Sequence, residues 1–353
     1  MNRRDALRSS LAAGVCGLFP MDRSRAEPRR AVPLPADGTG KIWTVRGPIE
    51  PKDLGICLPH EHVMVDFIGA DRVSTDRYDV NAVTRVVFPF LTQLKDLGVK
   101  SLAECTPAYL GRDVRLLASL SDATGLQILT NTGYYAANGG KHLPEHAKRE
   151  TADQLAERWL VEWKEGIDGS GIRPGFMKIG VGSGPLTPVE RNLVRAAAKV
   201  HLGTGLTIAA HTGGGRAAIE QLDLLQQEGV DASAFIWVHA QTERDAGRHN
   251  EAAARGAFVE FDGLASEANV IKYHVGLVNA MRRRGHFDHL LLSHDAGWFH
   301  VGEPNGGEFR SFEPLIQDFL PALRAEGYED EDVNILVVDN PRNALTLRVR
   351  ATR

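Results

Sequence analysis

Short apolar runs alternate with longer amphipathic stretches over most of this 353-residue chain. Such alternation is typical of strand–helix units and predicts a parallel sheet. The expected strands are 55–60, 99–104, 126–131, 175–179, 206–211, 234–239, 257–261 and 290–294. The helical patterns after them are 81–97, 112–124, 151–167, 188–202, 216–227, 243–255, 267–284 and 312–325. The predicted fold is α/β, a single closed (β/α)8 TIM barrel, preceded by a short strand pair at 41–49.

The first 40 residues differ in composition from the rest. Arg3 and Arg4 precede the apolar stretch 11–19 and the triplet Ser24-Arg25-Ala26. Residues 1–26 are therefore predicted to be a twin-arginine-type signal peptide that exports the protein to the periplasm, with a disordered basic tail as the alternative. Residues 27–40, rich in Pro, Arg and Gly, are expected to be a flexible lead-in. The barrel domain then covers 41–353.

Composition narrows the function classes. The hydrophobic fraction of 43% and the charged fraction of 24% are ordinary for a soluble globular domain. A formal net charge of -4 argues against a nucleic-acid partner. No apolar run after the first twenty residues is long enough to cross a bilayer, so no membrane partner is expected for the mature chain. Cys16, Cys57 and Cys105 have neither zinc-knuckle nor disulfide-framework spacing.

Histidines mark the ends of several predicted strands. His60-Glu61-His62 follows the first apolar run, and alternation along an extended chain places His60 and His62 on one face, with Glu61 on the other. Two surface histidines on a loop are the alternative interpretation. His211, His239 and Asp295 end strands five, six and eight. Barrel enzymes keep their active sites at this face, so these side chains are candidate metal ligands.

Lys178 lies inside the fourth predicted strand, in Phe176-Met177-Lys178-Ile179. Burial disfavours the ammonium form of a lysine, and a neutral amine can react with carbon dioxide to give an anionic carbamate. A carbamate offers two oxygens and can bridge two divalent ions. The alternative is a lysine whose amine reaches the rim of the barrel.

These motifs together resemble the phosphotriesterase family of the amidohydrolase superfamily. The likeness covers about residues 43–345 and departs from the family at Cys57, where threonine is usual. The segments that carry it are 54–63, 175–180, 184–190, 210–212, 238–240, 293–295 and 340–342.

The resemblance implies a site for two divalent metal ions, with zinc as the expected metal. His60, His62 and Asp295 would hold one ion, and His211 and His239 the other. Carboxylated Lys178 and a hydroxide would bridge them. Glu104, at the end of strand two, is an alternative bridge, because part of the family uses a glutamate there; Lys178 is preferred, with Glu104 close by.

The implied activity is hydrolysis of a lactone, carboxylic ester or phosphoester by the metal-bridging hydroxide, with phosphotriester cleavage as a side activity. Asp295 would relay the proton to the leaving group. The alternatives are an amide hydrolase with the same metal site and a barrel that binds a ligand without catalysis. The expected partner is a small-molecule substrate, and a homodimer is a possible assembly.

Several aromatic residues and the remaining histidines are assigned other roles. Aromatic candidates for lining the substrate pocket are Tyr134, Tyr135, Trp298, Phe299 and His300. His294 is expected to support Asp295 from the opposite face of the strand. Solvated or capping roles are expected for His142, His146, His201, His249, His274, His286 and His289.

Overall fold

The structure, a computed structural model, describes residues 38–352. The predicted signal peptide and most of the lead-in lie outside the described residues and stay predictions. Of the lead-in, residues 38–40 form a turn. No helix in the described part of the chain is long and apolar enough to cross a membrane.

Parallel strands surround the barrel interior in two hydrogen-bonded runs, ordered β11-β10-β9-β8-β7-β6 and β12-β3-β4-β5. A separate antiparallel pair, β1 and β2, precedes them as predicted. The strands are β1 Ile42–Thr44, β2 Gly47–Ile49, β3 Cys57–Val65, β4 Ser101–Glu104, β5 Gln127–Leu129, β6 Asn131–Thr132, β7 Phe176–Val181, β8 Ile208–Thr212, β9 Phe235–Val238, β10 Phe258–Phe261, β11 Leu290–Leu292 and β12 Gly297–His300.

The two runs meet at two seams. At one seam only Thr130 separates β5 from β6. At the other, the eighth strand is split, because β11 pairs with β10 while β12 pairs with β3. Between them, the Asp295 N–H donates to the His60 carbonyl at 3.1 Å. The predicted closed barrel is confirmed, and β12 lies between the predicted strand 290–294 and the predicted helix 312–325, where no strand was expected.

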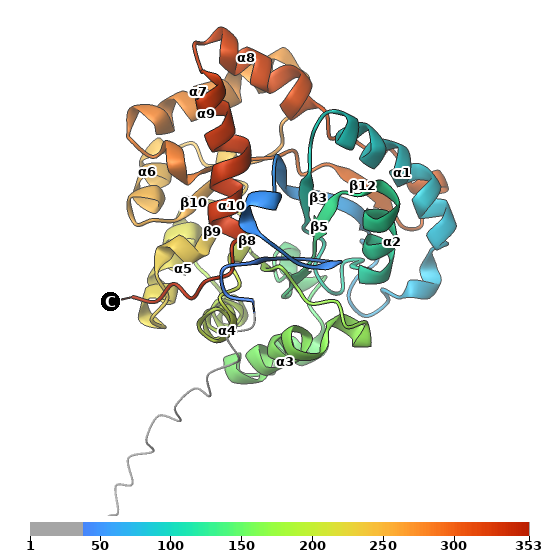
Figure 1. Ribbon diagram of the computed structural model, residues 1–353. Helices are drawn as coiled ribbons and strands as arrows, with labels where there is room; N and C mark the ends of the chain where they lie inside the picture. The colour runs from blue at the N-terminus through green and yellow to red at the C-terminus, as the bar shows by residue number, and fades with distance from the viewer. Residues whose placement is uncertain (1–37, 353) are drawn as a thin grey trace, which may run out of the picture. The chain divides into compact units, whose positions relative to one another are not determined.

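Helices α1 to α8 follow one another around the strands, and α9 and α10 run in front of the strands in this view (Figure 1). They are α1 Val80–Asp96, α2 Val114–Thr124, α3 Ala152–Glu165, α4 Pro188–Thr204, α5 Gly215–Gln227, α6 Ala246–Ala254, α7 Ala268–Arg283, α8 Leu320–Ala325, α9 Asp330–Asn334 and α10 Asn340–Leu345. The last predicted helix is wrong in detail: Leu315–Phe319 is a π-helix that leads into α8. Pro321 lacks the N–H that a regular ladder requires. A second π-helix, Ile335–Asp339, similarly precedes Pro341.

Local sequence signals explain where α4 begins and ends. Thr187 and Glu190 form a capping box, and Pro188 occupies the first turn, where its missing N–H is harmless. Gly205 ends the helix with a left-handed φ of 79°. The predicted start at residue 188 is confirmed.

A bulge in β3 sets the direction of the site residues. Relative to β4, the strand gains one residue between Leu58 and Glu61. Before the bulge, Cys57 packs with the cluster inside the barrel and Leu58 with the outer core beneath the helices. The extra residue reverses this alternation, so His60 and His62 face the interior. The strand was predicted to end at His60, but it continues to Val65.

Candidate metal centre

His60 and His62 meet Asp295 across the seam of the barrel. The Nε2 atoms of His62 and His60 lie 3.1 Å and 3.6 Å from Asp295 Oδ1. This oxygen is buried and has no hydrogen-bond partner among the described residues. Two imidazole nitrogens that converge on an unpartnered carboxylate oxygen are a donor set that fits a divalent metal ion.

His211, near the end of β8, and His239, directly after β9, lie at the same end of the barrel. Their rings are 4.5 Å apart, and the His239 ring lies 5.1 Å from that of His60. The Tyr135 hydroxyl lies 3.0 Å from His211 Nε2. The structure therefore brings together the four histidines and the aspartate that the sequence singled out.

Buried acceptors orient three of these rings by holding Nδ1. His60 Nδ1 lies 2.7 Å from Glu260 Oε1, and His239 Nδ1 lies 2.7 Å from Asp262 Oδ1. His62 Nδ1 lies 2.8 Å from the Thr106 hydroxyl. A histidine that donates from Nδ1 keeps the Nε2 lone pair for a metal, which is the usual arrangement around metal-binding histidines.

Glu260, Asp262 and Thr106 were missed by the sequence analysis. Glu260 and Asp262 are two residues apart at the end of β10, so an extended chain places both on its inner face. This spacing could have indicated site residues on the seventh predicted strand, 257–261, for which the sequence analysis named no candidate. Thr106 follows β4 and carries no comparable signal.

Lys178 and Glu104 occupy different sides of the barrel wall. Lys178 is 2% exposed, and its Nζ lies 2.9 Å from His60 Nε2. On β4, Ala103 packs inside the barrel and Leu102 outside it, so alternation directs Glu104 outward. The Val63 N–H and the Thr106 hydroxyl donate to Glu104 Oε1, and the Thr106 N–H to Oε2. Its oxygens are thus already engaged by protein donors.

The candidate ligands line a cavity of about 230 Å³. Apolar and aromatic groups form much of its wall, and a charged rim with His300, Glu303, Glu308 and Arg310 lies further out. Of the histidines expected to be solvated or capping, His142, His201, His249 and His274 are at most 3% exposed, so a solvated role is wrong for them, and His142 lines the cavity. The other residues on the wall are His60, His62, Phe67, Cys105, Pro107, Leu110, Tyr135, Asn138, Lys178, His211, His239, Asp295 and Trp298.

Burial prepares several side chains for metal binding. It lowers the pKa of His62 to about 4 and, together with the neighbouring His239, lowers that of His211. For Asp295, burial raises the pKa, but His60 and His62 outweigh this effect and bring it to about 2. At neutral pH the two histidines are therefore neutral and the aspartate is ionised, which are the forms that coordinate metals.

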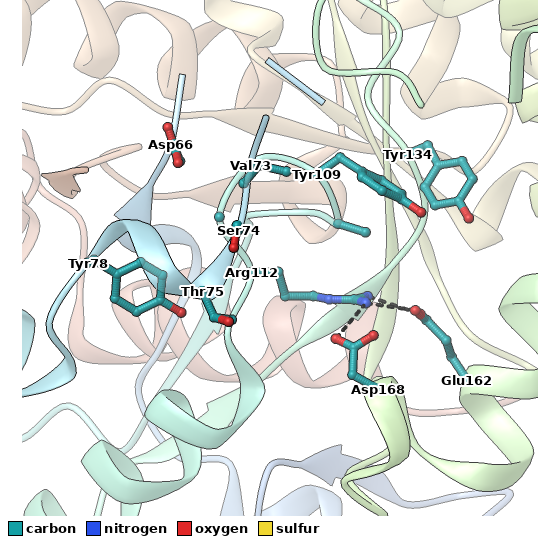
Figure 2. Close-up of a pocket in the computed structure, with 12 residues that line it drawn as sticks. Asp66, Val73, Ser74, Thr75, Tyr78, Tyr109, Arg112, Tyr134, Glu162 and Asp168 are labelled. Carbon is teal, nitrogen blue, oxygen red and sulfur yellow. Dashed lines mark hydrogen bonds and ion pairs between the residues drawn. The ribbon is translucent and has the colours of Figure 1, made fainter. Parts of the chain in front are cut away.

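A second cavity of about 230 Å³ lies behind the wall of the first. Tyr109 and Tyr134 line it, and their neighbours Leu110 and Tyr135 line the metal cavity. Figure 2 shows Arg112 directed at Glu162 and Asp168, and the guanidinium lies 2.7 Å from the Glu162 carboxylate. No histidine is among its lining residues in the described chain, so the candidate metal ligands belong to the first cavity alone.

The fold and this cavity define a class. Clustered histidines and a carboxylate at the carboxyl ends of parallel barrel strands are the arrangement of α/β-barrel hydrolases that use metals. Residues 40–345 match the Phosphotriesterase family, and the chain belongs to this family of hydrolases.

Relatives of known name support this membership. The chain is 30% identical to the phosphotriesterase homology protein of Escherichia coli, over 81% of this chain and 96% of the relative. It is 26% identical to an N-acetyltaurine hydrolase of Tetraodon nigroviridis, over 88% and 99%. Its fold is similar to that of a mutant PTE-like lactonase of Deinococcus radiodurans, with a TM-score of 0.78, 30% identity and coverage of 86% and 99%.

Proposed function

We propose that this protein hydrolyses carboxylic esters, lactones foremost, with two divalent metal ions in the cavity, and that phosphotriester cleavage is a side activity. The observation that carries the proposal is the convergence of His60 and His62 on the unpartnered Asp295 oxygen. Lys178, whose amine lies against His60, adjoins this group.

The residues divide between two ions. His60, His62 and Asp295 would hold the first and His211 and His239 the second, with carboxylated Lys178 between them. Nitrogen donors with carboxylate oxygens favour zinc. Bound here, the ions would supply hydroxide near neutral pH and polarise the scissile carbonyl or phosphoryl oxygen. Glu104 faces outward and is the weaker candidate for a bridge.

Asp295 acts as the acid–base group in this proposal. Its carboxylate is ionised and partly open to the cavity, with 22% of the side chain exposed. It takes a proton from the attacking water and passes it to the leaving group. A binding protein has no need for such a group, which argues against the non-catalytic alternative.

The cavity wall favours an ester with an apolar part and a polar part. Phe67, Leu110 and Trp298 offer apolar surface beside the histidines. Glu308 and Arg310 at the rim offer charged groups to the outer portion of the substrate. The lactonase relative supports ester hydrolysis, and the N-acetyltaurine hydrolase relative makes amide hydrolysis the second candidate.

A substrate screen tests the reaction class. The zinc-loaded protein would be assayed with lactones, open-chain carboxylic esters, N-acyl amides, phosphoesters and phosphotriesters under the same conditions. We expect the highest kcat/KM for a lactone or carboxylic ester. An amide with the highest kcat/KM would replace the proposal by the second candidate, and binding without turnover of any class would support the non-catalytic barrel.

The variant Asp295→Asn tests the proton relay. It keeps one ligating oxygen but cannot accept a proton, so we expect near-normal metal content and a loss of kcat on the order of 10²–10⁴-fold. Substrates with poor leaving groups should lose most. Metal content and turnover are measured on one preparation, with Asp223→Asn, a surface aspartate paired with Arg255, as the control. Full turnover by a fully loaded variant would leave Asp295 with a ligand role only.

A further inference from the structure

The segment 293–296 carries Asp295 but belongs to no strand. It joins β11 to β12 at the seam of the barrel. Asp295 adopts a left-handed φ of 52°, a conformation that non-glycine residues keep only when their surroundings impose it. The position of the Asp295 carboxylate therefore depends on the contacts that hold this segment.

Glu61 supplies four of these contacts from a fully buried position. Its Oε1 accepts from the Ser293 hydroxyl at 2.7 Å, from the His294 N–H at 3.0 Å and from His294 Nδ1 at 2.6 Å. Its Oε2 accepts from the Ala296 N–H at 2.9 Å. The Glu61 carboxylate thus accepts hydrogen bonds from residues on both sides of Asp295.

The hydrogen-bond network around Glu61 extends in two directions, to β3 and to the first π-helix. Ser293 Oγ also accepts the His60 N–H at 3.0 Å, and the His62 N–H donates to the Ala296 carbonyl at 2.9 Å. On the far side, His294 Nε2 accepts the Leu315 N–H at 2.9 Å, where the first π-helix begins. One carboxylate therefore couples the His60–His62 strand, the Asp295 segment and the following helix.

We infer that Glu61 is a positioning residue, which fixes the direction of the Asp295 carboxylate relative to His60 and His62 while lying on the opposite face of β3. The inference rests on the proposed hydrolytic function for its kinetic consequence. It assigns to the middle residue of the His-Glu-His motif a role distinct from metal binding: Glu61 is not among the described residues that line the cavity, and it acts through residues 293–296.

The variant Glu61→Gln disrupts these hydrogen bonds to residues 293–296 with little change in side-chain volume. A glutamine has one acceptor oxygen, so in either orientation its amide N–H groups face a buried donor of residues 293–296. We expect kcat to fall about 10- to 100-fold, the range typical for residues that orient metal ligands, with little change in KM. Zinc content should stay near that of the wild type, while the visible spectrum of the cobalt-substituted protein should change.

Glu190→Gln is the matched control. Glu190 is also a buried carboxylate that accepts N–H groups, from Gly182 and Thr187, but it caps α4 and, within the described part of the chain, makes no hydrogen bond to residues 293–296. This control should lower thermal stability and leave kcat and the cobalt spectrum unchanged. A wild-type kcat and cobalt spectrum for Glu61→Gln would overturn the inference, as would equal changes in both variants.

If Glu61→Gln does not fold, two variants of His294 test the same inference. His294→Asn keeps a donor near the position of Nδ1, whereas His294→Leu removes it. We expect the leucine variant to lose kcat and change the cobalt spectrum, and the asparagine variant to retain more of both; equal behaviour would overturn the inference. If the wild type hydrolyses no substrate of the screen, the proposed function fails, and the cobalt spectra still test the role of Glu61.

Discussion

In the proposed two-metal site, the nature of the bridging ligand depends on Lys178. Its side chain is buried in β7 with Nζ against His60 Nε2. A charged ammonium at this point would repel a divalent ion, whereas a carbamate would bind it. In the proposed site, retention of two ions would therefore require the carboxylated form of Lys178.

The variant Lys178→Ala tests this directly. Without the bridging group we expect loss of at least one ion and of most activity. Added short carboxylates with excess zinc should restore part of both, because they fill the space that the carbamate leaves. Zinc per chain is measured by elemental analysis beside turnover. Retention of two ions by Lys178→Ala and their loss from Glu104→Ala would assign the bridge to Glu104 instead.

At the residue scale, the sequence located the candidate ligands more readily than the residues that support their rings. His60, His62, His211, His239 and Asp295 lie at or just after the ends of predicted strands, so strand direction alone predicts that they meet at one end of the barrel. The supports of their rings depend on which strands become neighbours. Glu260 supports His60 from 200 positions along the chain.

At the element scale, β12 pairs with β3 directly after the segment that carries Asp295. Gly297 pairs with His62 and has a left-handed φ of 87°. A Cβ at this position would collide with the His62 carbonyl and would lie 2.8 Å from the Phe312 ring. The close approach of β12 to β3 therefore requires glycine.

Gly297→Ala should weaken this seam. We expect a loss of roughly 1–3 kcal/mol from the backbone conformation alone, with a further steric contribution, and weaker metal binding because His62 lies opposite. Gly276→Ala is the control: it lies within α7 with no atom within 4 Å of the added Cβ and should gain roughly 0.5–1 kcal/mol. The free energies of unfolding of the two variants are compared by denaturant unfolding, and equal values would contradict the prediction.

The elements themselves were predicted unevenly. Strands and helices with clear periodicity and caps, such as α4 from Pro188, were found near their observed bounds. The continuation of β3 beyond His60 was not, because the bulge before Glu61 breaks the alternation on which the prediction relies. The strand β12 was missed because residues 297–307 include four glycines, which is typical of a loop. The first of these residues, 297–300, form a strand because they pair with β3.

At the scale of the whole molecule, residues far apart in the sequence close the floor of the barrel, which is the end opposite the candidate ligands. Ile42 and Leu345 join the cluster inside the barrel. His201, near the end of α4, lies 2.8 Å from the Leu206 carbonyl through Nδ1 and accepts the Arg350 N–H at 2.9 Å through Nε2. This histidine therefore links the start of β8 to the C-terminal segment.

His201 should make stability depend on pH. Burial lowers its pKa to about 4, whereas in the unfolded chain the value is about 6.5. Because the unfolded chain binds the proton first, the contribution of His201 is complete above pH 6.5 and declines as the pH falls toward 4, by up to on the order of 3 kcal/mol.

Urea unfolding of the wild type and of His201→Gln between pH 7 and pH 4.5 checks this. Other groups, the metal ligands included, titrate equally in both proteins, so the difference between their slopes isolates His201. We expect the wild type to lose stability more steeply than the variant. Parallel curves would show that His201 is protonated in the folded protein as easily as in the unfolded chain.

Both ends of the described chain lie at this floor. The Gly40 N–H donates to the Leu347 carbonyl at 2.8 Å, and the Leu347 N–H donates to the Lys41 carbonyl at 2.9 Å. The candidate ligands, by contrast, lie at the carboxyl ends of the strands. A purification tag, a fused carrier or a solid support joined directly to either end of the described residues, 38–352, would therefore stand opposite the mouth of the barrel, and the immobilised protein would present its cavity to the solution.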